Sequence, residues 1–205
     1  MRPAAELLML EADALPEVLA RQTLAAMERP TLLSGWRVRD VIAHCGAALH
    51  RLVDGEELVF TPEANQVDVE ERASWPIVDV TAELFEAYPR AAAAIDAAGG
   101  AFDGLGLGEW IHGGDIREPL GEPDAYDSSG IDLAIPLLAA RSIAQEAPGV
   151  RVHLGEREFD FGVGEPVGEL RADAASFVRL CAVRAPDRRR FELTGVREPA
   201  LVLFS

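Results

Sequence analysis

The sequence predicts a helical part followed by a smaller α+β part, with the change near residue 147. In the first part apolar residues recur with a period near 3.6, the spacing of one helix face. After Pro148-Gly149 the pattern alternates with period two, as in Val150-Arg-Val-His-Leu154, which is typical of strands. The length of 205 residues suffices for one large or two small domains. We therefore expect two domains, residues 1–147 and 148–205.

The expected helices of the first part are bounded by residues that start or stop helices. The second follows Ser34-Gly35, Gly99-Gly100 ends the third, and Pro119 and Gly121 stop the fourth. The stretch 54–76 is acidic, contains proline and lacks periodicity, so it is expected to be a long surface loop. The helices are expected at 4–28, 36–53, 78–98, 109–116 and 130–147.

The second part is expected to begin with a hairpin that turns at Gly155-Glu156. A helix with buried Phe177, Leu180 and Cys181 should follow the third strand. The strands are expected at 150–154, 158–161, 169–171, 191–193 and 200–204, and the helix at 172–185.

Composition excludes several classes of function. The formal charge of −16 argues against nucleic acid or anionic membranes as partners. All 19 positive charges are arginine, so a Schiff-base lysine and a Walker-A lysine are both excluded. Two isolated cysteines do not make a disulfide framework. With neither a signal-peptide pattern nor a membrane-spanning run, the expected location is the cytoplasm. The arginine- and alanine-rich, lysine-free usage is typical of a GC-rich bacterial genome.

Two segments contain residues that could form one metal site. On the second helix Asp40 lies one turn before His44, so the Asp40 carboxylate could orient the imidazole. Near the fourth helix Glu109 and His112 are three residues apart and can project toward one point. Because a carboxylate and two imidazoles are three ligands, a fourth position would be open for water or substrate.

A structural role for these histidines is the alternative. A single histidine on an apolar helix is more often a hydrogen-bonded core residue than a ligand, and Glu-x-x-His pairs are common by chance. The other two histidines, His50 and His153, lack an acidic residue at helical spacing on an inward face.

Together these segments resemble the mycothiol-dependent maleylpyruvate isomerase family. The resemblance rests on Gly35-Trp36-Arg37-Val38-Arg39-Asp40-Val41-Ile42-Ala43-His44, on His112-Gly-Gly-Asp115-Ile116-Arg117, and on the tract from Leu170 to Gly195. It implies a DinB-like up-down four-helix bundle followed by a small mixed α/β domain. It also implies a divalent metal, usually zinc, and mycothiol as the thiol cosubstrate.

The resemblance also implies roles for individual residues. The metal ligands would be His44, Glu109 and His112, although Gly108 stands where the family's Glu-x-x-x-His pair has its glutamate. Asp40 and Asp115 would contact the metal ligands without binding the metal themselves. Arg184, in a segment similar to a Gly-Arg-Pro-like segment of the family, would pair with a substrate carboxylate. Its alternative role is that of a solvated arginine at a helix end.

The expected activity is addition of a thiolate to a small electrophile, as in an isomerase or an S-transferase. Expected partners are a small-molecule substrate and a low-molecular-weight thiol, in a monomer or homodimer. Two other functions stay open. One is a non-catalytic small-molecule or metal-binding protein, and the other is metal-assisted hydrolysis with Glu109 as the general base.

Overall fold

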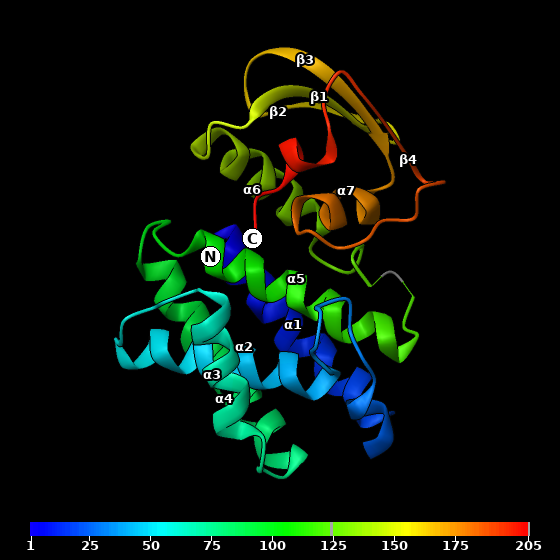
Figure 1. Cartoon of the computed structure of the whole chain (residues 1–205). Helices are drawn as coiled ribbons and strands as arrows, with labels where there is room; N and C mark the ends of the chain where they lie inside the picture. The colour runs from blue at the N-terminus through cyan, green and yellow to red at the C-terminus, as the bar shows by residue number, and fades with distance from the viewer. Residues whose placement is uncertain (124, 205) are drawn as a thin grey trace. The chain divides into compact units, whose positions relative to one another are not determined.

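The computed structural model describes residues 1–123 and 125–204, and these form two compact units, Met1–Ala125 and Tyr126–Ser205. Within the described residues the first unit is helical and all the strands lie in the second (Figure 1). A helical part followed by a small α/β part is therefore confirmed.

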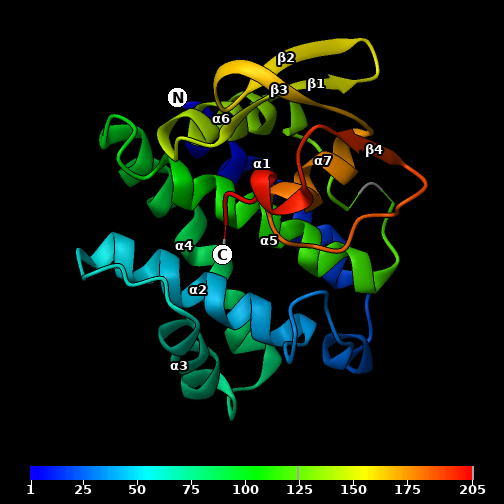
Figure 2. The ribbon, with the colours of Figure 1, turned by 45° about the horizontal axis from the view of Figure 1, so that its top comes forward.

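Four helices form the bundle of the first unit: α1 (Pro3–Ala20), α2 (Val38–Asp54), α4 (Ile77–Ala97) and α5 (Asp103–Leu120). Both α1 and α2 pack against α4 and α5, which is the neighbour pattern of a four-helix bundle (Figure 2). The core between them is apolar, and its largest fully buried side chains include Trp110, Tyr88, Leu7, Leu8, Ile42, Leu49, Leu84 and Ile95.

The expected surface loop at 54–76 is wrong, because it contains helix α3 (Pro62–Arg72). The helix has clear start signals: the Thr61 side chain accepts a hydrogen bond from the Ala64 backbone N–H at 3.2 Å, and Pro62 occupies the first turn. Only Asp68 and Val69 of this helix are buried. Because so few side chains face inward, the sequence of α3 shows no helical repeat of apolar residues, although α3 packs against α2.

Two other expected helices have different bounds in the structure. The first helix ends at Ala20, since Thr23 is extended, and a 3-10 turn η1 (Leu24–Glu28) follows. The fourth, α5, starts at Asp103 and so includes three more glycines than expected, residues that disfavour helix on their own. Packing explains this: a Cβ at Gly106 would lie 2.6 Å from the Ala4 carbonyl oxygen of α1. The glycine therefore permits close contact between α1 and α5.

The second unit is a four-stranded sheet with two helices on one face (Figures 1 and 2). The order is β2-β1-β3-β4, in which β1 and β3 are parallel and the outer pairs are antiparallel. Phe159 and Phe161 of β2 contact the ring of Phe177 of α7 edge to face. The bounds are α6 (Ile131–Ala144), β1 (Pro148–Leu154), β2 (Arg157–Phe161), β3 (Val163–Ala172), α7 (Ala174–Cys181) and β4 (Phe191–Thr194).

The division between the units falls after Ala125, earlier than the expected boundary at 147. Helix α6 packs against β2 and α7, and its Ser142 Oγ accepts a 2.7 Å hydrogen bond from the Gly162 backbone N–H. These contacts make α6 part of the second unit, which its sequence pattern alone does not reveal.

The expected strand at 200–204 is wrong. The chain forms a 3-10 turn η2 (Glu198–Leu201), after which the backbone N–H groups of Leu203 and Phe204 both donate to the Cys181 carbonyl. The alternation of buried and half-buried residues at 201–204 thus comes from contact with the end of α7 and not from a sheet. Among the described residues no helix is long and apolar enough to cross a membrane.

Candidate active site in the helical unit

His44 is held by a carboxylate from α3. Its Nδ1 lies 3.0 Å from Oδ2 of Asp68, and both side chains are buried. Burial lowers the pKa of His44, and His112 lowers it further, against the hydrogen bond to Asp68. The imidazole is therefore neutral near pH 7, with its proton on the Nδ1 that faces the carboxylate.

Asp68 is itself fixed by Arg51 of α2. The guanidinium donates to both carboxylate oxygens, with Nη2 lying 2.7 Å from Oδ2. Burial alone would raise the pKa of Asp68, but the hydrogen bonds from Arg51 and His44 hold it below its usual value. The three side chains form one chain of contacts, Arg51–Asp68–His44, in which the carboxylate stays ionised.

His112 has a similar arrangement within α5. Its Nδ1 lies 2.9 Å from Oδ2 of the fully buried Asp115, three residues later on the same helix. The His112 side chain is 18% exposed to solvent. Both histidines therefore use Nδ1 for a carboxylate, and no hydrogen bond to either Nε2 is found among the described residues.

The two imidazoles lie next to each other. Their ring centroids are 5.4 Å apart at an interplanar angle of 85°, and the ring centroid of Trp36 lies 5.3 Å from that of His44. The bundle thus brings together the two histidines that the sequence singled out. His50 and His153 lie elsewhere, with His50 Nε2 at 3.2 Å from the Glu83 carbonyl oxygen and His153 beside Glu158 and Glu169.

Glu109 is buried on the same helix as His112. Its carboxyl group contacts the Cys45 thiol, and its Oε2 has no hydrogen-bond partner within the described part of the chain. Burial raises the pKa of Glu109 to about 8. The group is therefore a neutral acid at pH 7. The described residues contain no group of three His, Cys, Asp or Glu side chains placed to hold a metal ion.

The structure assigns Asp40 a different partner from the expected one. Its carboxylate accepts hydrogen bonds from the Arg37 backbone N–H and from the Arg37 guanidinium, at 2.8 Å each. These contacts cap the start of α2. The residue that orients His44 is Asp68, which sequence reasoning missed because α3 was interpreted as a loop.

A second buried ion pair lies within the bundle. The Arg117 guanidinium donates to both oxygens of Glu11 on α1, at 2.9 and 2.7 Å. A Cβ at Gly113 would lie 2.5 Å from Glu11 Oε2, so only glycine leaves room for this pair. Arg117 is thus engaged with α1, while Asp115 faces His112.

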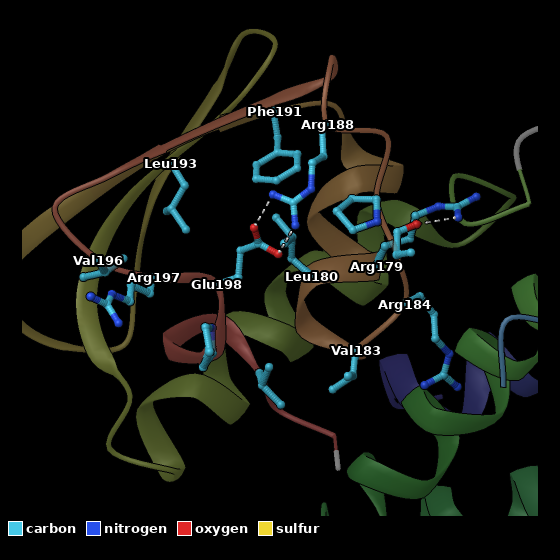
Figure 3. Close-up of a pocket in the computed structure, with 14 residues that line it drawn as sticks. Arg179, Leu180, Val183, Arg184, Arg188, Phe191, Leu193, Val196, Arg197 and Glu198 are labelled. Carbon is cyan, nitrogen blue, oxygen red and sulfur yellow. Dashed lines mark hydrogen bonds and ion pairs between the residues drawn. The ribbon is translucent and has the colours of Figure 1, made fainter. Parts of the chain in front are cut away.

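Arg184 belongs to the second unit, where its Nη1 donates to the Ala182 carbonyl and its side chain lines a cleft (Figure 3). The residue before it, Val183, has φ = 57°, a left-handed conformation that is rare for a β-branched residue. The Arg184 N–H donates to the Arg179 carbonyl at 2.8 Å, the bond that closes a helix end of this type. Its expected pairing with a substrate carboxylate stays a prediction.

These features define a class: a four-helix bundle with a pair of carboxylate-held histidines, followed by a small α/β unit. Residues 8–104 match the family model described as the mycothiol maleylpyruvate isomerase N-terminal domain. The helical unit therefore matches the N-terminal domain of this family, and the resemblance is confirmed. The matched segment includes His44 and Asp68 and ends before Glu109 and His112.

Solved structures extend the likeness to the second unit. The crystal structure of the mycothiol-dependent maleylpyruvate isomerase is similar with a TM-score of 0.67 and 17% identity, covering 95% of this chain and 94% of that chain. A histidine-to-alanine mutant of that enzyme gives a TM-score of 0.65 with the same identity and coverage. At this identity the likeness shows a common fold. No curated protein sequence matches the chain.

Proposed function

We propose that the protein is a mycothiol-dependent enzyme that adds a thiolate to a small electrophilic substrate, as an isomerase or an S-transferase. The observation that carries the proposal is the histidine pair, in which Asp68 and Asp115 occupy the Nδ1 atoms. The family match and the names of the similar structures support mycothiol as the thiol.

His44 is the base in this proposal. A carboxylate on Nδ1 fixes the tautomer whose Nε2 carries a lone pair, which is the form that accepts a proton. The thiol proton moves to His44 Nε2, and the sulfur forms a bond to one carbon of an activated double bond. In an isomerase the adduct rotates about the resulting single bond, and the carbon–sulfur bond then breaks. The thiolate leaves and regains its proton from the imidazolium. In an S-transferase the neighbouring carbon takes that proton and the adduct is released.

Arg184 would recognise a carboxylate of the substrate. The chain carries a formal charge of −16 and no lysine, so an acidic substrate needs an arginine to offset the repulsion. A guanidinium can form two parallel hydrogen bonds to a carboxylate. Arg184→Ala should lower kcat/KM by about 10- to 100-fold, and Arg184→Lys should restore only part of it.

The divalent metal is a separate part of the proposal. The two imidazoles and the unpartnered Glu109 Oε2 are ligands that zinc accepts, but the Glu109 carboxyl group contacts Cys45 and does not complete a three-ligand group. A metal on His44 Nε2 would occupy the lone pair that accepts the thiol proton, so the proton transfer above is assigned to the metal-free protein. Elemental analysis of protein supplied with zinc and then desalted tests the metal, since His44, Glu109 and His112 predict one ion per chain.

A non-catalytic binding protein is the second candidate function. The feature that favours a binding protein is Glu109, which lies three residues before His112 and contacts the Cys45 thiol. Such a protein would bind mycothiol or a metal without turnover.

Thiol-dependent turnover distinguishes the two candidates. Maleylpyruvate, the substrate named for the similar structures, serves as the isomerase probe and diethyl maleate, an activated alkene, as the transferase probe, each with and without mycothiol. We expect mycothiol-dependent turnover that falls about 100-fold or more in His44→Gln. The matched control is His50→Gln, which changes a histidine of the same helix outside the pair. If no turnover depends on mycothiol, or both variants keep full activity, the proposed catalytic role of His44 is wrong.

A further inference from the structure

The second unit contains a cleft of about 930 Å³ between the end of α7, the segment leading into β4, and η2 (Figure 3). All of its lining residues belong to this unit. Four arginines and one glutamate contribute the charged side chains: Arg179, Arg184, Arg188, Arg197 and Glu198. The cleft is thus locally positive in a chain whose formal charge is −16.

Two of these arginines are held by the protein. The Arg179 guanidinium lies 4.4 Å from the centre of the Tyr126 ring and donates to the Ala185 carbonyl at 3.3 Å. Arg184 donates to the Ala182 carbonyl. These contacts fix the wall formed by the end of α7.

The other two arginines are accessible to a ligand. Arg188 points into the cleft from the segment before β4 and donates to Glu198 of η2 at 2.8 Å, with 75% of its side chain exposed (Figure 3). Arg197 is exposed, and no ion pair or hydrogen bond of its side chain is found among the described residues. A single glutamate thus balances only part of this charge.

The remainder of the cleft is apolar. Leu180 is buried, and Phe191, Leu193 and Val202 are half-buried. Val183 also lines the cleft, with 60% of its surface exposed and the strained φ of 57°. Strain of this kind concentrates at ligand sites, where an exposed apolar side chain can contact a bound molecule.

We propose that this cleft binds a small organic anion, whose charged group is attracted by Arg188 and Arg197 and whose hydrocarbon part lies on the apolar wall. The volume is in the range of small-molecule sites, and a purely inorganic anion would leave the apolar side chains uncovered. The proposal relies on Arg188 and Arg197 and on neither Arg184, a thiol nor the histidines, so it goes beyond the proposed enzyme activity.

Binding of anilinonaphthalene sulfonate, a fluorescent aromatic anion, tests the proposal on the full-length protein. We expect one binding site, displaced by octanoate but not by the same concentration of inorganic phosphate. Arg188→Gln and Arg197→Gln should each raise the Kd by about 5-fold, since partly exposed charge pairs contribute modestly. Glu198→Gln should lower the Kd by a similar factor, because it removes the competing carboxylate.

Two variants that change the same charges outside the cleft are the controls. Arg171→Gln on β3 and Glu192→Gln on β4 should leave the Kd within about twofold of the wild type. If the Arg188–Glu198 ion pair only stabilises the shape of the cleft, Arg188→Gln and Glu198→Gln should both weaken dye binding. That result would overturn the proposal. Equal Kd values in all the variants would overturn it as well, since the dye would then be bound elsewhere.

Discussion

His44 Nδ1 lies 3.0 Å from Asp68 Oδ2, so a histidine of the second bundle helix is oriented by the short helix that follows it. The contact is buried on both sides, and Arg51 holds the carboxylate from the same helix as His44. Buried polar contacts of this kind keep a catalytic imidazole in one tautomer and one orientation. The candidate site is thus built from α2, α3 and α5 together.

Replacing Asp68 by asparagine should impair the chemistry more than binding. The amide can offer its NH2 group to Nδ1, which favours the other tautomer and places the proton on Nε2. We expect kcat for the thiol-dependent reaction to fall about 10- to 100-fold with KM little changed, as for other residues that orient a functional histidine. Glu70→Gln on the exposed face of α3 is the control. Equal loss of kcat in both variants would contradict a positioning role for Asp68.

Glu109 should make the stability of the metal-free protein depend on pH. Its folded pKa of about 8 exceeds the usual value of 4.5, so the folded state keeps a proton that the unfolded state loses. This stabilisation is complete below about pH 4.5 and is lost as the pH rises toward 8. Urea unfolding of Glu109→Gln, which stays neutral, should show a smaller decrease in stability over that range. If the free energy of unfolding of Glu109→Gln changes with pH as steeply as that of the wild type, Glu109 is ionised in the folded protein.

Removing only one charge of the buried Glu11–Arg117 pair should lower the free energy of unfolding. Glu11→Gln leaves an arginine that is 5% exposed without its counter-charge, and we expect a loss of about 3 kcal/mol. Glu11→Leu combined with Arg117→Met should recover most of that loss, because both desolvation costs disappear together. Urea unfolding of the variants measures this coupling. Additive losses would indicate that the two side chains do not stabilise each other.

Replacing Val183 by glycine should stabilise the second unit. The left-handed φ of 57° costs an L-residue roughly 1–2 kcal/mol, and glycine avoids most of that cost at a helix end. We expect a gain of about 1 kcal/mol in the free energy of unfolding. Ala185→Gly, two residues further on and outside the left-handed region, should instead lower stability. If Val183→Gly is less stable than the wild type, the contacts of the valine side chain contribute more than the backbone strain costs.

The sequence by itself determined the two-part fold, four helices of the bundle and the pair His44 and His112. These features follow from local patterns: apolar residues at helical spacing, glycine and proline at helix ends, and polar residues at fixed offsets. The helical spacing of Glu109 and His112 is likewise a property of one helix. Such signals need no knowledge of what packs against the helix.

Only the tertiary structure decided which carboxylate orients His44. Asp40 lies at the right spacing from His44, yet Arg37 takes its carboxylate because both belong to the first turn of α2. Asp68 is 24 residues from His44 and reaches it because α3 packs on α2. Similarly, α5 extends through its glycines because α1 lies against them. These outcomes depend on contacts between elements that are distant in sequence, and no local pattern records them.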